Sequence, residues 1–111
     1  MSSANRRLIV SNVDDANELV RLGTVEFDQS NRATLSTEGS GPAVEDLKTA
    51  WQEISSLPQL TWKQSRPDVI DGKPVTRIVG VQARPGDDNY IYAVLNTLER
   101  KYGYTVDLEG G

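Results

Sequence analysis

The chain contains neither cysteine nor histidine. No disulfide, and no zinc site built from nitrogen or sulfur ligands, can therefore stabilise its fold. The 111 residues, of which 37% are hydrophobic and 25% charged, must instead bury a hydrophobic core. This length and composition are typical of one globular domain. We predict a single domain over residues 1–111, in which the polar residues 1–7 fray.

The same two absences restrict what the protein can do. No Cys–His or Ser–His pair is available for nucleophilic catalysis, so an enzyme is disfavoured, and we expect no cofactor and no metal ion. The net charge of −4 disfavours bulk binding to nucleic acid or anionic lipid. No apolar run approaches the about 18 residues of a membrane span, and we see no export signal. We therefore expect a cytoplasmic protein without membrane contact.

The first part of the chain has two interpretations. Leu8–Val10 is typical of a short strand. Residues 14–22 fit a short helix, because an acidic start is followed by apolar residues and then by a glycine that can stop a helix. The alternative is a strand from Leu19 to Phe27.

Alternation of apolar and polar residues then predicts a hairpin, with strands at 24–28 and 32–36 around a polar turn. A loop at 38–42 leads into the first clear helix, Pro42–Leu57, since proline suits the first helical position. One apolar stripe of this helix, at steps of three and four, is expected to pack against the sheet. It consists of Val44, Leu47, Trp51 and Ile54.

In the second half, strands are predicted at Leu60–Ser65 and Val75–Ala83, joined by a loop over 67–74 with Asp71-Gly72 at its tip. A second helix follows, with a glycine stop, and a final strand covers Tyr104–Leu108. The apolar stripe of the second helix consists of Ile91, Val94, Leu95, Leu98 and Tyr102.

From about residue 32 the predicted order is strand, helix, strand, strand, helix, strand. This β-α-β-β-α-β order is the split βαβ order of the ferredoxin-like fold, in which both helices cover one face of the sheet. We therefore predict an α+β fold with a ferredoxin-like core. The N-terminal strand, short helix and hairpin would extend this core at a sheet edge or on the other face.

Charge is distributed unevenly, and the predicted hairpin at 60–84 shows this most clearly. Its five cations and its two carboxylates, Asp68 and Asp71, give it a net charge of +3, whereas the rest of the chain carries −7. The alternative to a binding role is a solvated hairpin whose cations offset the surplus of carboxylates. We take the cations as candidate ligand-binding residues: Lys63, Arg66, Lys73, Arg77 and Arg84.

A basic sheet face can bind RNA when aromatic side chains on it stack with bases. The hairpin offers only Trp62, which shares a face with Leu60 and is expected to point into the core. The RNP-type run of Lys or Arg, Gly, and Phe or Tyr is missing, so nucleic acid is a disfavoured partner. Arg77 shares a face with three valines, and an unpaired buried charge is too costly. We expect it at an edge, paired with a carboxylate, or at an interface.

Two further patterns have structural explanations that we favour over ligand binding. The glycine-rich loop at 38–42 precedes a helix, as anion-binding loops do, but Pro42 removes a donor and acidic neighbours repel anions. The acidic pairs at 14–15, 45–46 and 87–88 stand at predicted helix starts, where they stabilise the helix dipole.

These observations favour a non-enzymatic protein-interaction or structural module. We expect its partner to be another protein or a second copy of the chain, with a homodimer favoured because a ferredoxin-like sheet leaves edges or a face to cover. The alternative is a small-ligand or nucleic-acid-binding module that uses the basic 60–84 hairpin. A steep loss of oligonucleotide affinity with added salt would support that alternative.

Overall fold

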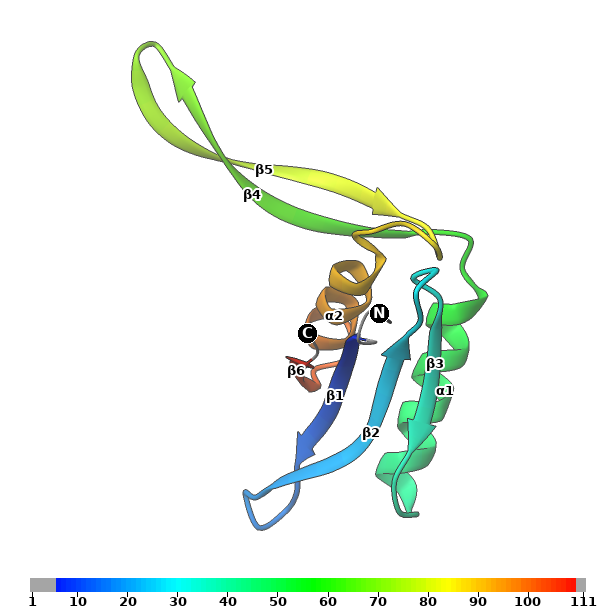
Figure 1. Ribbon diagram of the computed structural model, residues 1–111. Coiled ribbons are helices and arrows are strands. Elements are labelled where there is room, and N and C mark those ends of the chain that lie inside the picture. Colours follow the sequence, from blue (N-terminus) through cyan, green and yellow to red (C-terminus); the bar gives the residue numbers. More distant parts are fainter. Residues whose placement is uncertain (1–5, 110–111) are drawn as a thin grey trace.

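The computed structural model describes residues 6–109 and shows in them an α+β fold of six strands and two helices (Figure 1). A four-stranded antiparallel sheet carries both helices, and a separate two-stranded hairpin projects from this body. In chain order the elements are β1 (Arg6–Val13), β2 (Leu19–Phe27), β3 (Ala33–Thr37), α1 (Pro42–Ser56), β4 (Leu60–Ile70), β5 (Lys73–Ala83), α2 (Tyr90–Arg100) and β6 (Thr105–Glu109).

The sheet has the strand order β3-β2-β1-β6, so β1 and β2 occupy its centre. Leu8 of β1 lies opposite Val25 of β2 and Leu108 of β6, and Val25 also lies opposite Leu35 of β3. Residues paired in this way share one face of the sheet. One extra residue of β2, Leu22, is accommodated at a bulge and is buried.

The core lies between this face and the helices. α1 contacts β2 and β3, whereas α2 contacts β6 (Figure 1). Gly23 of β2 marks a close approach, because a Cβ atom there would lie 3.2 Å from Cδ2 of Leu47 in α1 and 2.7 Å from the carbonyl oxygen of Ser36. The largest fully buried side chains are Phe27, Leu8, Leu47, Ile54, Ile91, Leu98, Val10, Val25 and Val94.

The α+β class is confirmed, but the predicted ferredoxin-like core is not shown. The split βαβ order would place the two strands between the helices in the main sheet. Instead β4 and β5 form a two-stranded sheet of their own, and the N-terminal strands complete the main sheet. The reason is that β1 pairs on both sides, with β2 and with β6. The segment predicted as an extension is therefore the centre of the sheet.

The predicted helix over 14–22 is wrong, and the alternative strand from Leu19 to Phe27 coincides with β2. Asp14 forms a turn, because its carboxylate accepts hydrogen bonds of 2.9 Å from the backbone N–H groups of Ala16 and Glu18. This local bonding satisfies the backbone without a helix. The apolar residues that follow then pair with β1.

The β2–β3 hairpin and both helices are confirmed. In α1 the buried stripe includes Ala50, whereas Trp51 is only partly buried against the core. β1 begins at Arg6, so the prediction that Arg6 and Arg7 fray is wrong. Residues 1–5, also predicted to fray, lie outside the described residues.

The β4–β5 hairpin makes the molecule elongated. Its principal extents are 55 × 41 × 27 Å, and its radius of gyration is 16.0 Å, whereas a compact chain of this length is expected at about 13 Å. The hairpin extends well beyond the body (Figure 1). Neither helix in residues 6–109 combines the length and the apolar character needed to cross a membrane.

Candidate interaction surface

The β4–β5 hairpin, called the arm below, consists of two eleven-residue strands joined by a two-residue turn. Asp71 and Gly72 form the tip, with φ angles of 52° and 75°. A type I′ turn needs positive φ at both positions, and Asp-Gly is a preferred sequence for it. The ladder therefore continues up to the Ile70–Lys73 pair. The prediction of a loop over 67–74 is wrong, because this tight turn keeps both strands paired to the tip.

Packing against α2 holds the base of the arm to the body. Leu60 and Ala83 lie opposite each other and are both buried. The ring of Trp62, on the same face, stacks on Tyr92 of α2 with 6.5 Å between ring centroids and 26° between ring planes. Such a pair contributes about 0.5–1.5 kcal/mol beyond area burial. The indole Nε1 of Trp62 is buried and has no hydrogen-bond partner among the described residues, so apolar packing holds the base.

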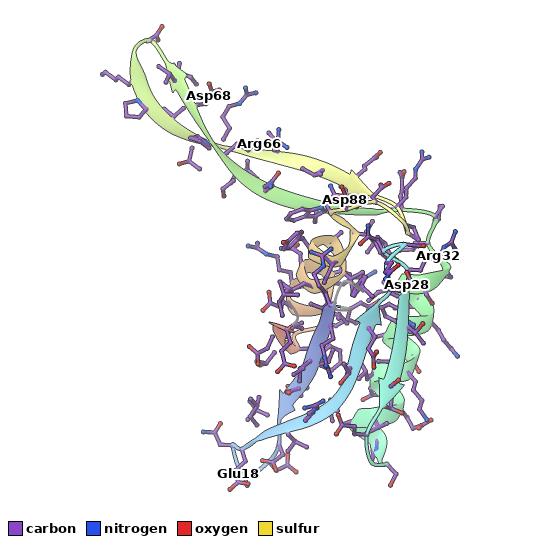
Figure 2. All side chains as sticks on the ribbon, viewed as in Figure 1. Glu18, Asp28, Arg32, Arg66, Asp68 and Asp88 are labelled. Atoms are coloured by element: carbon purple, nitrogen blue, oxygen red, sulfur yellow. The ribbon has the colours of Figure 1, made fainter. Side chains whose placement is uncertain are left out.

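Beyond the Gln64–Val79 pair the arm leaves the body, and most side chains of this distal arm, residues 65–78, are exposed. Figure 2 shows side chains along the projecting ribbon far from the body. Three of these exposed side chains are large and aliphatic. A two-stranded hairpin alone is also only marginally stable in water. The exposed fractions are 65% for Val69, 54% for Ile70 and 61% for Ile78.

One face of the distal arm is basic. Arg66 lies directly opposite Arg77, and Lys73 follows on the same face beside the tip. Like charges directly opposite each other destabilise a strand pair. Arg77 Nη1 donates to Asp68 Oδ2 at 3.1 Å, and Arg66 donates to Gln64 Oε1 at 3.1 and 3.2 Å. The carboxylate partner predicted as one possibility for Arg77 is therefore present, on an exposed surface.

The other face carries Val69 near the tip and Ile78 at the start of the distal arm, together with two prolines. Pro67 and Pro74 have no N–H group, so the outer edges of the arm lack donors at these positions. Proline in an edge strand is one way in which proteins prevent another strand from pairing there. These two prolines therefore oppose extension of the arm's ladder by a further strand.

The five predicted ligand-binding cations do not converge on one site. Arg66, Lys73 and Arg77 share a face of the distal arm, Lys63 lies on the other face nearer the base, and Arg84 directly follows β5. All five residues are exposed. This arrangement, spread over two faces and the length of the arm, does not form a pocket for one small ligand.

A second surface lies at the start of α1. A groove of about 350 Å³ runs between β2 and the loop that leads into this helix. The Arg21–Glu38 ion pair, with an N–O distance of 2.5 Å, lies at its margin. We call residues 20–22 and 38–44 the α1 groove. Its apolar side chains are Val20, Leu22, Pro42, Ala43 and Val44.

The α1 groove lies at the acidic end of the body. Asp14, Asp15 and Glu18 occupy the turn between β1 and β2, and Figure 2 places Glu18 at the end farthest from the arm. With Glu38 and Arg21, these side chains carry a net charge of −3. Two apolar side chains beside the turn are also exposed, Val13 by 50% and Leu19 by 56%.

Sequence reasoning missed this groove. From the sequence, the loop at 38–42 is favoured as a structural connection over an anion site, and Val20 has two interpretations, in a helix over 14–22 or in a strand from Leu19 to Phe27. A usable signal was present, because a Gly-Ser-Gly-Pro break before an amphipathic helix separates the helix start from the strand that it covers.

Three tyrosines in residues 6–109 have a raised pKa. Burial raises the pKa of Tyr90 and Tyr104. Burial and a hydrogen bond to Glu53 raise the pKa of Tyr102 to about 12. These phenols therefore remain protonated at neutral pH and are not activated as bases or nucleophiles. Within the same range, no cluster of three or more acidic side chains is placed to hold a metal ion.

In comparisons with known proteins, no family model, no curated protein and no solved structure matches this chain.

Proposed function

We propose that this protein is a non-enzymatic structural or interaction module that acts by placing its distal arm on the surface of a partner protein. The observation that carries the proposal is the uncovered arm, residues 65–78, with its exposed aliphatic side chains. Nothing in the fold of the body requires these residues, since the arm is anchored by its base. Full burial of an aliphatic side chain on a partner contributes about 1.5–3 kcal/mol.

The alternative of nucleic-acid binding has less support. Base stacking needs an exposed aromatic side chain, and the one aromatic residue of the arm, Trp62, is already stacked on Tyr92. A small anionic ligand is also poorly supported, because the cations lie on two faces and along the length of the arm. A titration with a fluorescent oligonucleotide separates these cases. Tight binding that weakens steeply with salt would replace our proposal with the nucleic-acid alternative.

The proposal is tested by shortening the arm within the full chain. Gln64 and Val79 are cross-strand partners and lie an even number of pairs from the tip, so an Asn-Gly turn can replace residues 65–78. We expect the shortened protein to keep the melting temperature of the body, because the base and core are unchanged. In size-exclusion chromatography of extracts of the native cells, the shortened protein should elute at its monomer size, whereas the unaltered chain elutes in a larger complex.

A site-specific photocrosslinker identifies the contact surface in the same cells. Placed at Val69 in the unaltered chain, it should give a covalent protein adduct. Placed at Gln52, an exposed residue of α1 outside both surfaces, it should give none. An adduct at Gln52 alone, or complexes that persist with the shortened arm, would show that the arm is not the interaction surface.

A further inference from the structure

We infer that the partner of the arm is a second copy of this chain, and that the distal arm of one copy binds the α1 groove of the next. This inference rests on the proposed role of the arm and names its partner. The two surfaces lie at opposite ends of the molecule: the arm projects from one end, and the groove lies at the other, where α1 begins (Figure 1). Each copy therefore offers one of each.

The apolar parts of the two surfaces fit in size. Val69 and Ile70 stand beside the two-residue tip and are more than half exposed. The groove, at about 350 Å³, falls at the small end of protein binding pockets. That volume suits a few aliphatic side chains from a narrow element such as a hairpin tip. It is too small for a helix or a strand of a body.

The charges are also complementary. The arm, residues 60–83, carries a net charge of +2, and the turn and margin around the groove carry −3. Ion pairs within the described chain do not use the cations Arg66 and Lys73, or the carboxylates of Asp15 and Glu18. Docking of the tip would bring these groups together. Complementary charge of this kind selects the partner and speeds its encounter.

The same observations disfavour two other self-contacts. Two arms packed through their basic faces would bring together four arginines, because Arg66 and Arg77 already oppose each other within one arm. Strand addition along the arm is obstructed by Pro67 and Pro74. A contact between two different surfaces is heterologous, so copies assemble head to tail into a ring or a filament rather than into a symmetric dimer.

Mixing two purified full-length variants tests this pairing by sedimentation velocity. The arm variant carries Val69→Asp and Ile70→Asp. The groove variant carries Ala43→Arg, which fills the groove from an exposed position in the first turn of α1. Unaltered protein is expected to form species larger than a dimer as its concentration rises. Each variant alone should self-associate about a hundredfold or more weakly, because apolar contacts are lost and a charge is introduced. Their mixture should give a 1:1 dimer, since one intact arm and one intact groove remain.

Matched controls place the same side chains elsewhere on the same elements. Thr61→Asp lies near the base of β4, and Gln52→Arg lies on α1 outside the groove; both positions are exposed. Both controls should assemble like the unaltered protein, and thermal melts check that all variants fold.

Three results would overturn the inference. They are a monomeric unaltered protein at high micromolar concentration, a symmetric dimer that survives both variants, and a mixture that stays monomeric although the unaltered protein assembles. None of them decides the proposed function, because the crosslink at Val69 in native cells reports the arm contact whatever the partner is. Loss of that crosslink would instead reject the proposed function itself.

Discussion

Two glycines in strands should respond in opposite ways to the same substitution. Gly23 lies in β2 beneath α1, and Gly80 lies in β5 near the base of the arm. A Cβ atom at Gly23 would lie 2.7 Å from a backbone oxygen and 3.2 Å from the Leu47 side chain, so sheet or helix must shift. A Cβ atom at Gly80 would have its nearest neighbour, Thr61 Cγ2, at 3.9 Å, which is ordinary contact.

The magnitudes follow from two opposing effects. Overpacking a core costs about 1–3 kcal/mol. Replacing glycine by alanine in a compatible conformation stabilises a protein by about 0.4–1 kcal/mol, because the unfolded chain loses freedom. We therefore expect Gly23→Ala to lower the free energy of unfolding by about 1–2 kcal/mol, and Gly80→Ala to raise it by up to about 1 kcal/mol.

Urea unfolding, followed by tryptophan fluorescence, measures the free energy of unfolding of both variants. In a thermal melt, the melting temperature should fall by roughly 4–8 °C for Gly23→Ala. The paired design controls for the general effect of losing a glycine. If Gly23→Ala is as stable as the unaltered protein, or if both variants shift in the same direction, α1 does not pack on β2 as closely as we argue.

Substitutions at three further positions test the core, the base of the arm and one titration. Phe27→Ala should cost about 3–5 kcal/mol in urea unfolding, because the ring is 1% exposed and meets Tyr90 edge-on at 6.2 Å; a cost below about 1 kcal/mol would contradict this packing. Trp62→Phe should be tolerated in the same assay, since it keeps a ring on Tyr92 and removes the unpaired N–H, whereas Trp62→Ala should be clearly less stable than Trp62→Phe. Tyr102 has a pKa raised from 10.0 to about 12, so the folded state keeps a proton that the unfolded state releases, and stability is lost as pH rises from 10 to 12. Tyr102→Phe should reduce this alkaline drop in melting temperature, and an unchanged drop would show that Tyr102 does not contribute to it.

The elements that sequence reasoning identified are those with local signals. A proline start and an apolar stripe predict α1, and the Asp71-Gly72 pair predicts the turn at the tip of the arm. The helix expected at 14–22 failed because an acidic start followed by apolar residues also describes a side-chain-capped turn that leads into a strand. Asp14 forms that turn by accepting two backbone hydrogen bonds. Whether such a segment forms a helix or a turn and a strand depends on whether a neighbouring strand is available for pairing, and here β1 is available.

The sheet order could not be predicted because it depends on pairing across almost the whole chain. Ile9 lies opposite Asp107, and no local pattern in β1 specifies β6 as its neighbour. The candidate site divides in the same way. The basic character of the arm was visible in the sequence, but the projection of its distal half was not. Projection depends on where the body ends, which is set by the packing of Trp62 on α2.

The uneven charge of the chain makes salt a direct test of how copies meet. The arm and the α1 groove carry opposite charges at opposite ends of a molecule 55 Å long. Screening shortens the reach of exposed charges from about 10 Å at 0.1 M salt to about 3 Å at 1 M salt. Head-to-tail association should therefore weaken as sodium chloride rises, while apolar contact between arms would strengthen or stay constant, because screening relieves the repulsion among their arginines.

Sedimentation velocity across a salt series measures whether self-association weakens or strengthens as salt rises. In Lys73→Glu the arm keeps its apolar tip but loses its positive charge, so its association should be weaker at low salt and less sensitive to salt. Association of the unaltered protein that grows with salt would reject the arm-to-groove contact in favour of contact between arms.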